Sequence, residues 1–258
     1  MRINNSLLSL FKISLRTCLL IIFLLCIWEC LIIVLKTPPY ILPTPKNVFI
    51  TLWQQRQLLY YQTLPTLLEM TIGFSLGTLF GMFSALVLAY SKPARLWFLP
   101  LLLISQSLPT FAIAPILVVW FGYGIATKII TTIIMIFFPI TNAFYDGLKN
   151  TNPAWVDLGR ITHASTFNFF WHIKIPAALP SLATGLRVAA AIAPIGAIVG
   201  EWVGSDRGLG FLMLNANARM QVSLMFAALL IIMLITISFY FCIDKLLRFL
   251  LPWEKWGR

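Results

Sequence analysis

The chain has 258 residues, of which 60% are hydrophobic and only 10% are charged, with a net charge of +11. A soluble globular domain carries about 25% charged residues, so this composition excludes an ordinary soluble protein. The basic residues lie at the ends of apolar runs and form no continuous stripe, which argues against nucleic-acid binding. We therefore expect an all-α integral membrane protein.

Six apolar runs are long enough to cross a bilayer as helices, which takes about 20 residues. They cover residues 15–35, 66–90, 96–121, 128–147, 179–202 and 224–250. The third contains Pro109 and Pro115, and we expect it to be broken there, as happens in membrane bundles where neighbouring groups satisfy the freed carbonyls. The first lacks a small-residue cleavage site, so we interpret it as a spanning helix and not as a signal peptide.

The basic residues predict how these helices are oriented. With the N-terminus in the cytoplasm, 13 of the 19 Lys and Arg lie inside and six lie outside, namely Lys36, Lys46, Arg56, Lys128, Arg207 and Arg219. This bias favours both termini in the cytoplasm. The longest cytoplasmic loop is then 148–178, and the outer segments are 36–65 and 203–223, the latter with the glycine cluster GSDRGLG.

The loop 148–178 is half polar and contains both histidines of the chain. Asn152 and Pro153 are typical of an N-cap and a first helical position, and predict a short helix that ends near Thr162. His163 would follow this helix, at a position that often takes a left-handed backbone. The two histidines are nine residues apart and lack the spacing of a metal site.

A second short helix is predicted after His163. Ser165 would cap it, Pro176 would end it, and Pro180 would open the next span. Its apolar surface is aromatic and comprises Phe167, Phe169, Phe170 and Trp171. This pattern leaves two interpretations open, which are a knob that docks on a partner protein and an amphipathic connector that rests on lipid headgroups.

The spacing of this loop resembles the EAA loop of the membrane subunits of bacterial ABC importers, with its pattern Glu-Ala-Ala, three residues, Gly, nine residues and Ile-x-Leu-Pro. Asp157 falls at the Glu position, and Leu158 and Gly159 at the Ala positions. His163 falls at the Gly position, and residues 173–176 read Ile-Lys-Ile-Pro. The spacing matches throughout, whereas the identities at 157–159 and 163 depart from the consensus.

This resemblance implies that the loop couples the chain to an ATPase subunit. The residues to which it assigns this role are Asp157, Gly159, Arg160, His163, Ile173 and Pro176. It also implies the type I ABC importer transmembrane fold. In that fold residues 1–63 would form an N-terminal transmembrane helix and a periplasmic connector, residues 64–250 the core with its coupling loop at 150–176, and residues 251–258 a cytoplasmic tail.

Further stretches resemble the branch of these permeases that imports nitrate, sulfonates, taurine and thiamine precursors. They are ILPTPKNVF, SLPTFAIAPILVVWFGYG and GLRVAAAIAPIGAIVGEW. The stretch GEWVGSDRGLGFLMLNANARMQ is most similar to permeases for the hydroxymethylpyrimidine precursor of thiamine. This resemblance implies that precursor as the solute, with an aliphatic sulfonate, taurine or nitrate as the alternative.

The chain contains no GxxxxGK loop followed by Ser or Thr, so we expect ATP and magnesium to bind to a separate ATPase chain, with no cofactor on this one. The resemblance implies two further partners, a periplasmic or lipid-anchored solute-binding protein and a second copy of the permease. The expected location is the bacterial inner membrane. A membrane-embedded enzyme would need clustered catalytic groups, and a motor-independent carrier or channel often shows inverted repeats; neither feature is evident.

Polar residues inside the apolar runs are candidates for the translocation path. Glu69 and Glu201 are expected near the outer side as a gate, with Arg207 or Arg219 as candidate partners, or as groups that make structural hydrogen bonds. Glu69 follows Pro65 and would lie in the first turn of its helix. Gln106 and Ser107 flank the Pro109 break, where they would contact the solute or satisfy carbonyls freed by the bend.

One glycine pattern predicts helix packing. Gly73, Gly77 and Gly81 recur every four residues within the second apolar run and therefore lie on one face of a helix. Such a face permits another helix to approach closely, so we expect it to be a packing surface.

Overall fold

A computed structural model describes residues 2–163 and 165–254, with the side chains at 2–14, 17, 18, 158 and 160 outside the described part. The described residues form helices joined by turns, with no β-strand among them. They divide into two compact units, which are described separately. The first unit comprises residues up to 59 together with 213–229, and the second comprises 60–212 together with the chain from residue 230.

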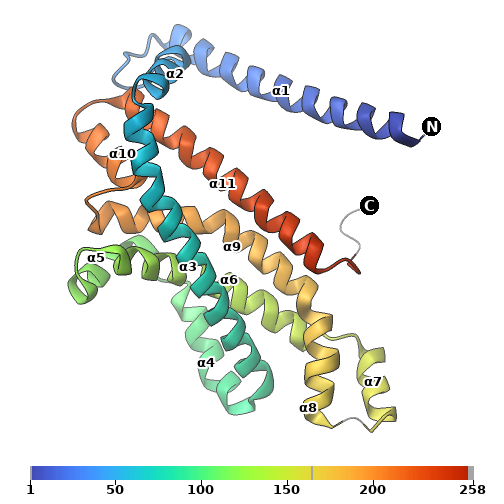
Figure 1. Cartoon of the computed structure of the whole chain (residues 1–258). Coiled ribbons are helices and arrows are strands. Elements are labelled where there is room, and N and C mark those ends of the chain that lie inside the picture. The colour runs from blue at the N-terminus through green and yellow to red at the C-terminus, as the bar shows by residue number, and fades with distance from the viewer. Residues whose placement is uncertain (1, 164, 255–258) are drawn as a thin grey trace. The chain divides into compact units, whose positions relative to one another are not determined.

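The first unit contains α1 (Arg2–Leu35) and α2 (Pro45–Gln54) (Figure 1). It also holds the end of α10 (Leu209–Ala218) and the beginning of α11 (Val222–Leu250). Helix α2 was not expected within the outer segment 36–65. It begins where the Thr44 hydroxyl accepts a hydrogen bond from the Asn47 N–H and Pro45 occupies the first helical position.

The core of the second unit is built on α3 (Arg56–Tyr90) and α6 (Ile125–Lys149). Gly73, Gly77 and Gly81 of α3 face α6, and a Cβ atom at Gly73 or Gly77 would come within 2.6 Å of an α6 side chain. The predicted packing surface is therefore confirmed, because only a residue without a side chain lets the two helices come so close.

Helix α9 (Ile175–Gly204) packs on another side of α6 by the same means. A Cβ atom at Gly196 or Gly200 would lie 2.7 Å from the Cα atoms of Thr132 and Lys128 respectively. The buried face of α9 is otherwise rich in alanine. Small residues thus place α6 in contact with both α3 and α9, and bring polar groups of all three helices close together.

The third apolar run is broken into α4 (Lys92–Ser105) and α5 (Thr110–Phe121), which meet at an angle of 103°. The break at Pro109 was predicted and is confirmed. The predicted break at Pro115 is wrong, because α5 continues through it. Proline in a helix removes one hydrogen bond, here to the Phe111 carbonyl, and one such loss does not end the helix.

Four helical segments are long and apolar enough to cross a membrane, namely Arg56–Tyr90, Ile125–Lys149, Thr166–Gly204 and Val222–Leu250. The bent pair of α4 and α5 adds a fifth, and α1 contributes the shorter apolar stretch Leu19–Leu35. Five of the six predicted runs are therefore helical throughout, and the third consists of two helices. Helix α3, however, begins at Arg56 and runs through Pro65, so the expected first-turn position of Glu69 is wrong.

Between α6 and α9 lie α7 (Pro153–Ile161), α8 (Thr166–Phe169) and a π-helical turn, η1 (Phe170–Lys174). We refer to residues 153–174 as the hairpin. It lies at the end of α9 opposite to α5 (Figure 1).

From the sequence we predicted that Pro176 ends the second short helix and that Pro180 opens the next span. This prediction is wrong. The helix is continuous from Thr166 to Gly204. In η1 the backbone widens, and the Ile175 N–H bonds to the Phe170 carbonyl five residues earlier. This widening changes the hydrogen-bond register just before Pro176, which could not donate to the carbonyl four residues before it.

Candidate functional site

A buried ion pair joins α3 and α6. The Lys128 ammonium lies 2.8 Å from Oε1 of Glu69, and these side chains are only 4% and 2% exposed. An unpaired charge at such a place costs several kcal/mol, so each group requires the other. The described ion pair of Glu69 is made with Lys128, which was not among the candidate partners Arg207 and Arg219.

Glu201, near the end of α9, is buried beside this pair and interacts electrostatically with both of its members. Its Oε1 accepts a 2.5 Å hydrogen bond from the Thr66 hydroxyl of α3. Its Oε2 accepts one of 2.5 Å from the Gly210 N–H in the first turn of α10. A carboxylate at a helix N-terminus is favourable because the helix dipole is positive there. Glu201 thus ties three helices together.

The loop before α10 is held by the same face of α3. The Gly208 N–H donates to Oε1 of Gln62 over 2.7 Å, and the Leu209 N–H donates to the Thr66 hydroxyl over 2.9 Å. Gly208 has a φ of +116°, and a Cβ atom there would collide with the Glu201 carboxyl group. The glycine is therefore required both by its backbone conformation and by the close approach of Glu201.

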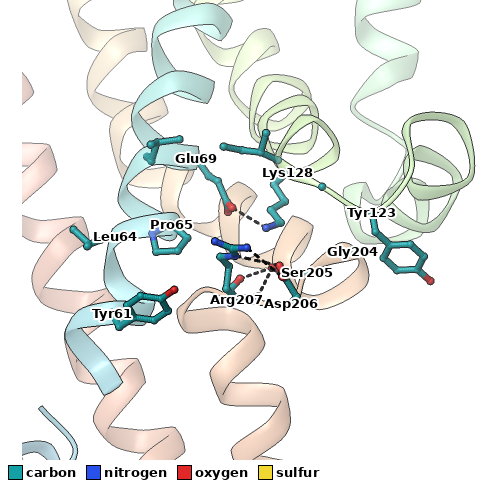
Figure 2. Close-up of a pocket in the computed structure, with 13 residues that line it drawn as sticks. Tyr61, Leu64, Pro65, Glu69, Tyr123, Lys128, Gly204, Ser205, Asp206 and Arg207 are labelled. Carbon is teal, nitrogen blue, oxygen red and sulfur yellow. Dashed lines mark hydrogen bonds and ion pairs between the residues drawn. The ribbon is translucent and has the colours of Figure 1, made fainter. Parts of the chain in front are cut away.

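A pocket of about 780 Å³ opens over the Glu69–Lys128 pair (Figure 2). Its walls come from α3, from the turn between α5 and α6, and from the loop between α9 and α10. The residues that line it are Tyr61, Leu64, Pro65, Leu68, Glu69, Tyr123, Gly124, Ile125, Lys128, Gly204, Ser205, Asp206 and Arg207. Most ligand pockets have between about 300 and 1,000 Å³, so this one has room for a small solute.

A second, exposed ion pair lies at the rim of this pocket. Arg207 Nε lies 3.4 Å from Oδ1 of Asp206, and a hydrogen bond from the guanidinium holds the pKa of Asp206 below its ordinary value. Asp206 is therefore ionised at neutral pH. Because Glu69 and Asp206 are matched by Lys128 and Arg207, the charged side chains that line the pocket carry no net charge.

The two predicted path residues of the third apolar run do not line this pocket. Gln106 and Ser107 lie exposed at the corner between α4 and α5. There the Ser107 N–H donates to the Ile104 carbonyl over 2.9 Å. Their contact with a solute stays a prediction.

At the other end of α9, the local sequence shapes the hairpin as predicted. Oδ1 of Asn152 accepts a 3.0 Å hydrogen bond from the Ala154 N–H and caps α7. His163 has a φ of +48°, the left-handed backbone expected after this helix. The Ser165 hydroxyl accepts a 3.2 Å hydrogen bond from the Asn168 N–H and caps α8. Both caps and the left-handed turn are therefore confirmed.

Two of the predicted coupling residues differ in exposure. Asp157 lies exposed on α7. Gly159 is buried, and a Cβ atom there would collide with the ring of Phe169. Gly159 thus closes α7 against α8 and has no side chain to offer a partner. The side chain of Arg160 lies outside the described residues.

The other coupling residues belong to the helix that leaves the hairpin. His163 is exposed in the turn, Ile173 is half-buried in η1, and Pro176 is the second residue of α9. Large apolar side chains remain exposed on the hairpin, namely Trp155, Ile161, Phe167 and Trp171. The hairpin therefore presents a partly apolar surface at the end of a long helix.

Sequence reasoning missed Lys128 and Thr66 as members of the buried network. Lys128 was counted only as an outer charge, and Thr66 was not singled out. A signal was present, because Lys128 interrupts the apolar stretch 125–136 and is the one cation within it, with two glutamates expected at a similar depth.

The fold and the two ends of α9 define a class of protein. A multi-pass helical core with an exposed helical hairpin between two spans is what the sequence resemblance to importer membrane subunits implied. In agreement, residues 77–255 match the family described as "binding-protein-dependent transport system inner membrane component". The chain belongs to this family of multi-pass inner membrane permeases.

Individual relatives agree with this assignment. A "probable ABC transporter permease protein" of Haemophilus influenzae is 52% identical over 92% of this chain and 97% of its own length. The formylaminopyrimidine transport permease protein ThiX of Halalkalibacterium halodurans is 36% identical over 94% of this chain and 97% of its own. Among solved structures, the inward facing MetNI methionine ABC transporter has a chain that matches with a TM-score of 0.65 at 18% identity, covering 76% of this chain and 97% of that one.

These findings establish the general role of the chain. It is the permease subunit of an ABC importer and has the transmembrane fold of such subunits. ATP is hydrolysed on a separate chain, and importers of this kind work with an ATPase and a solute-binding protein.

Proposed function

We propose that this permease passes a small aminopyrimidine, the hydroxymethylpyrimidine precursor of thiamine, across the inner membrane by alternating access. Two copies of the chain would enclose the path, and both termini would lie in the cytoplasm. The similarity to a permease named for formylaminopyrimidine supports the solute. An aliphatic sulfonate, taurine or nitrate is the alternative solute for the same machine.

One observation carries the proposed mechanism. The hairpin and the pocket lie at the two ends of one continuous helical segment, Thr166–Gly204. A helix of this length extends about 60 Å at 1.5 Å per residue. Closure of two ATPase subunits would move the docked hairpins, and this continuous segment would carry the motion to the opposite side of the membrane. The bundles would then alternate between inward-facing and outward-facing states.

The exposed face of the hairpin supports docking on the ATPase. Asp157, Trp155 and Ile161 offer a carboxylate beside apolar surface, which is the mixture expected of a protein interface. Contact with lipid headgroups is the competing role of this surface. In that case the ATPase would dock on another surface of the permease.

The solute is tested by ATPase activity in proteoliposomes that hold the permease, its ATPase and its binding protein. Each candidate solute is added singly. We expect stimulation by a hydroxymethyl-aminopyrimidine and none by sulfonates, taurine or nitrate. Stimulation by a sulfonate alone would show that the proposed solute is wrong and that the ATP-driven importer is right. A failure of the three proteins to form a complex would reject the proposed coupling.

Docking is tested by bulky substitutions on the hairpin. Asp157→Trp and His163→Trp should reduce co-purification of the ATPase with the permease. They should also uncouple ATP hydrolysis from solute uptake. Asn217→Trp, at an exposed polar residue of α10, is the matched control and should leave both unchanged. Full co-purification and normal uptake in the hairpin variants would show that the ATPase docks elsewhere.

A further inference from the structure

The pocket over the Glu69–Lys128 pair has properties that restrict its ligand. Its charged lining residues form two compensated ion pairs, one at the floor and one at the rim. Glu201 adds a further carboxylate close behind the floor. With every one of these groups ionised, the formal local charge is neutral to negative. A site with this charge disfavours anions, which includes sulfonates, nitrate and bicarbonate.

The floor of the pocket places a hydrogen-bond acceptor beside a donor. Oε2 of Glu69 is buried and accepts no hydrogen bond from a donor among the described residues, and the Glu69 carboxyl group interacts with that of Glu201. An ammonium has three donors, and the described bond from Lys128 to Oε1 of Glu69 occupies one of them. A buried carboxylate oxygen left unsatisfied is costly, so a ligand N–H group that reached it would be bound favourably.

Aromatic surface flanks this floor. Tyr61 of α3 and Tyr123 of the α5–α6 turn lie on either side of the ion pair (Figure 2). They are 62% and 82% exposed, so their rings contribute little to the packing of the protein itself. Exposed aromatic rings beside a polar floor suit stacking on a flat heterocycle. The Arg207 guanidinium, also close to the pair in Figure 2, would have to turn aside as a ligand enters.

We propose that this pocket is a solute-receiving site on the permease itself, selective for a planar, uncharged or weakly basic heteroaromatic that carries an amino group next to a ring nitrogen. The amino group would donate to Glu69, and the ring nitrogen would accept from Lys128. An aminopyrimidine has this edge, whereas an aliphatic sulfonate has neither the donor–acceptor edge nor the flat ring. The inference rests on the proposed function, because it explains selection of the same solute.

The site is tested on the complex of permease and ATPase in nanodiscs, without the binding protein. Binding of 4-amino-5-hydroxymethyl-2-methylpyrimidine is titrated by saturation-transfer NMR. Tyr61→Ala and Tyr123→Ala should each weaken binding about tenfold if the rings stack on the solute. Tyr60→Ala is the matched control, since Tyr60 is 69% exposed, neighbours Tyr61 on α3 and does not line the pocket.

A charge variant gives an independent test. Asp206→Asn removes one carboxylate from the rim and makes the local charge less negative, so ethanesulfonate should bind more tightly than it does to the unmodified complex. Equal affinities for the tyrosine variants and the Tyr60 control would overturn the site. If uptake of the pyrimidine by the complete system were normal in that case, the proposed function would still stand. If only sulfonate were taken up, both proposals would fall.

Discussion

The pocket end of α9 is assembled from side chains that are distant in the sequence, whereas the hairpin at its other end is shaped by neighbours. Thr66 and Glu201 are 135 residues apart, and Glu69 and Lys128 are 59 apart. In the hairpin, the caps by Asn152 and Ser165 join residues two and three apart. The first site is therefore only as stable as the bundle, while the second is formed mainly by local capping.

The two ends also differ in what they leave exposed. Glu69, Lys128 and Glu201 are buried; the first two pair with each other, and Glu201 accepts hydrogen bonds from Thr66 and Gly210. The hairpin leaves tryptophan, isoleucine and phenylalanine side chains exposed. This difference indicates that substitutions at the pocket end act first on the folding of the permease, and that substitutions at the hairpin act first on its assembly with the ATPase.

The largest effect is expected from breaking the buried ion pair. Lys128→Met leaves the Glu69 carboxylate buried without a counterion and should destabilise the permease by about 3–5 kcal/mol. The double variant Glu69→Gln with Lys128→Met removes both charges and should recover most of that loss. Thermal unfolding of the detergent-purified permease measures both. Equal stability of the single and double variants would contradict the inferred pairing.

The next effect is expected at the loop before α10. Gly208→Ala combines a φ of +116° with a collision between the new Cβ atom and Glu201, and should cost at least about 2 kcal/mol. Gly122→Ala is the control, because Gly122 has a φ of +76° but open space around it. The difference between their unfolding midpoints measures the collision alone. Similar values for the two would show that Glu201 does not press on this loop.

A smaller effect, confined to assembly, is expected in the hairpin. Gly159→Ala would force the ring of Phe169 aside and open the angle between α7 and α8, at a cost of about 1–3 kcal/mol. We expect less ATPase to co-purify, although alanine favours the helix more than glycine does. Adding Phe169→Leu makes room and should restore assembly. If the double variant assembled no better than Gly159→Ala, the contact would not set the hairpin geometry.

The smallest effect is expected at the turn between α7 and α8. His163 has a left-handed backbone, which costs a residue with a side chain about 1 kcal/mol relative to glycine. His163→Gly should therefore raise the unfolding midpoint slightly and keep ATPase coupling, whereas the β-branched His163→Val should lower both. Loss of coupling in His163→Gly would assign the imidazole itself a role at the ATPase.

Proline shows where a local rule was insufficient. Pro109 broke its helix as predicted, but Pro65, Pro115 and Pro176 lie within or at the start of continuous helices. Each removes a single hydrogen bond, and in a packed bundle that loss is offset by burial and, before Pro176, by the π-helical turn. The sequence predicted breaks at both Pro109 and Pro115, and it did not show that only Pro109 bends its helix.

The sequence by itself determined the membrane class, the six apolar helical runs, the caps and left-handed turn of the hairpin, and the glycine face of α3. These features depend on composition, on periodicity or on interactions between groups a few residues apart. Such local features can be predicted from the sequence. Only the tertiary structure decided that Lys128 neutralises Glu69, that Glu201 holds the start of α10, and that two tyrosines flank one pocket. The reason is that small residues on α3 and α9 set how closely these helices approach α6, and those distances select which distant charges meet.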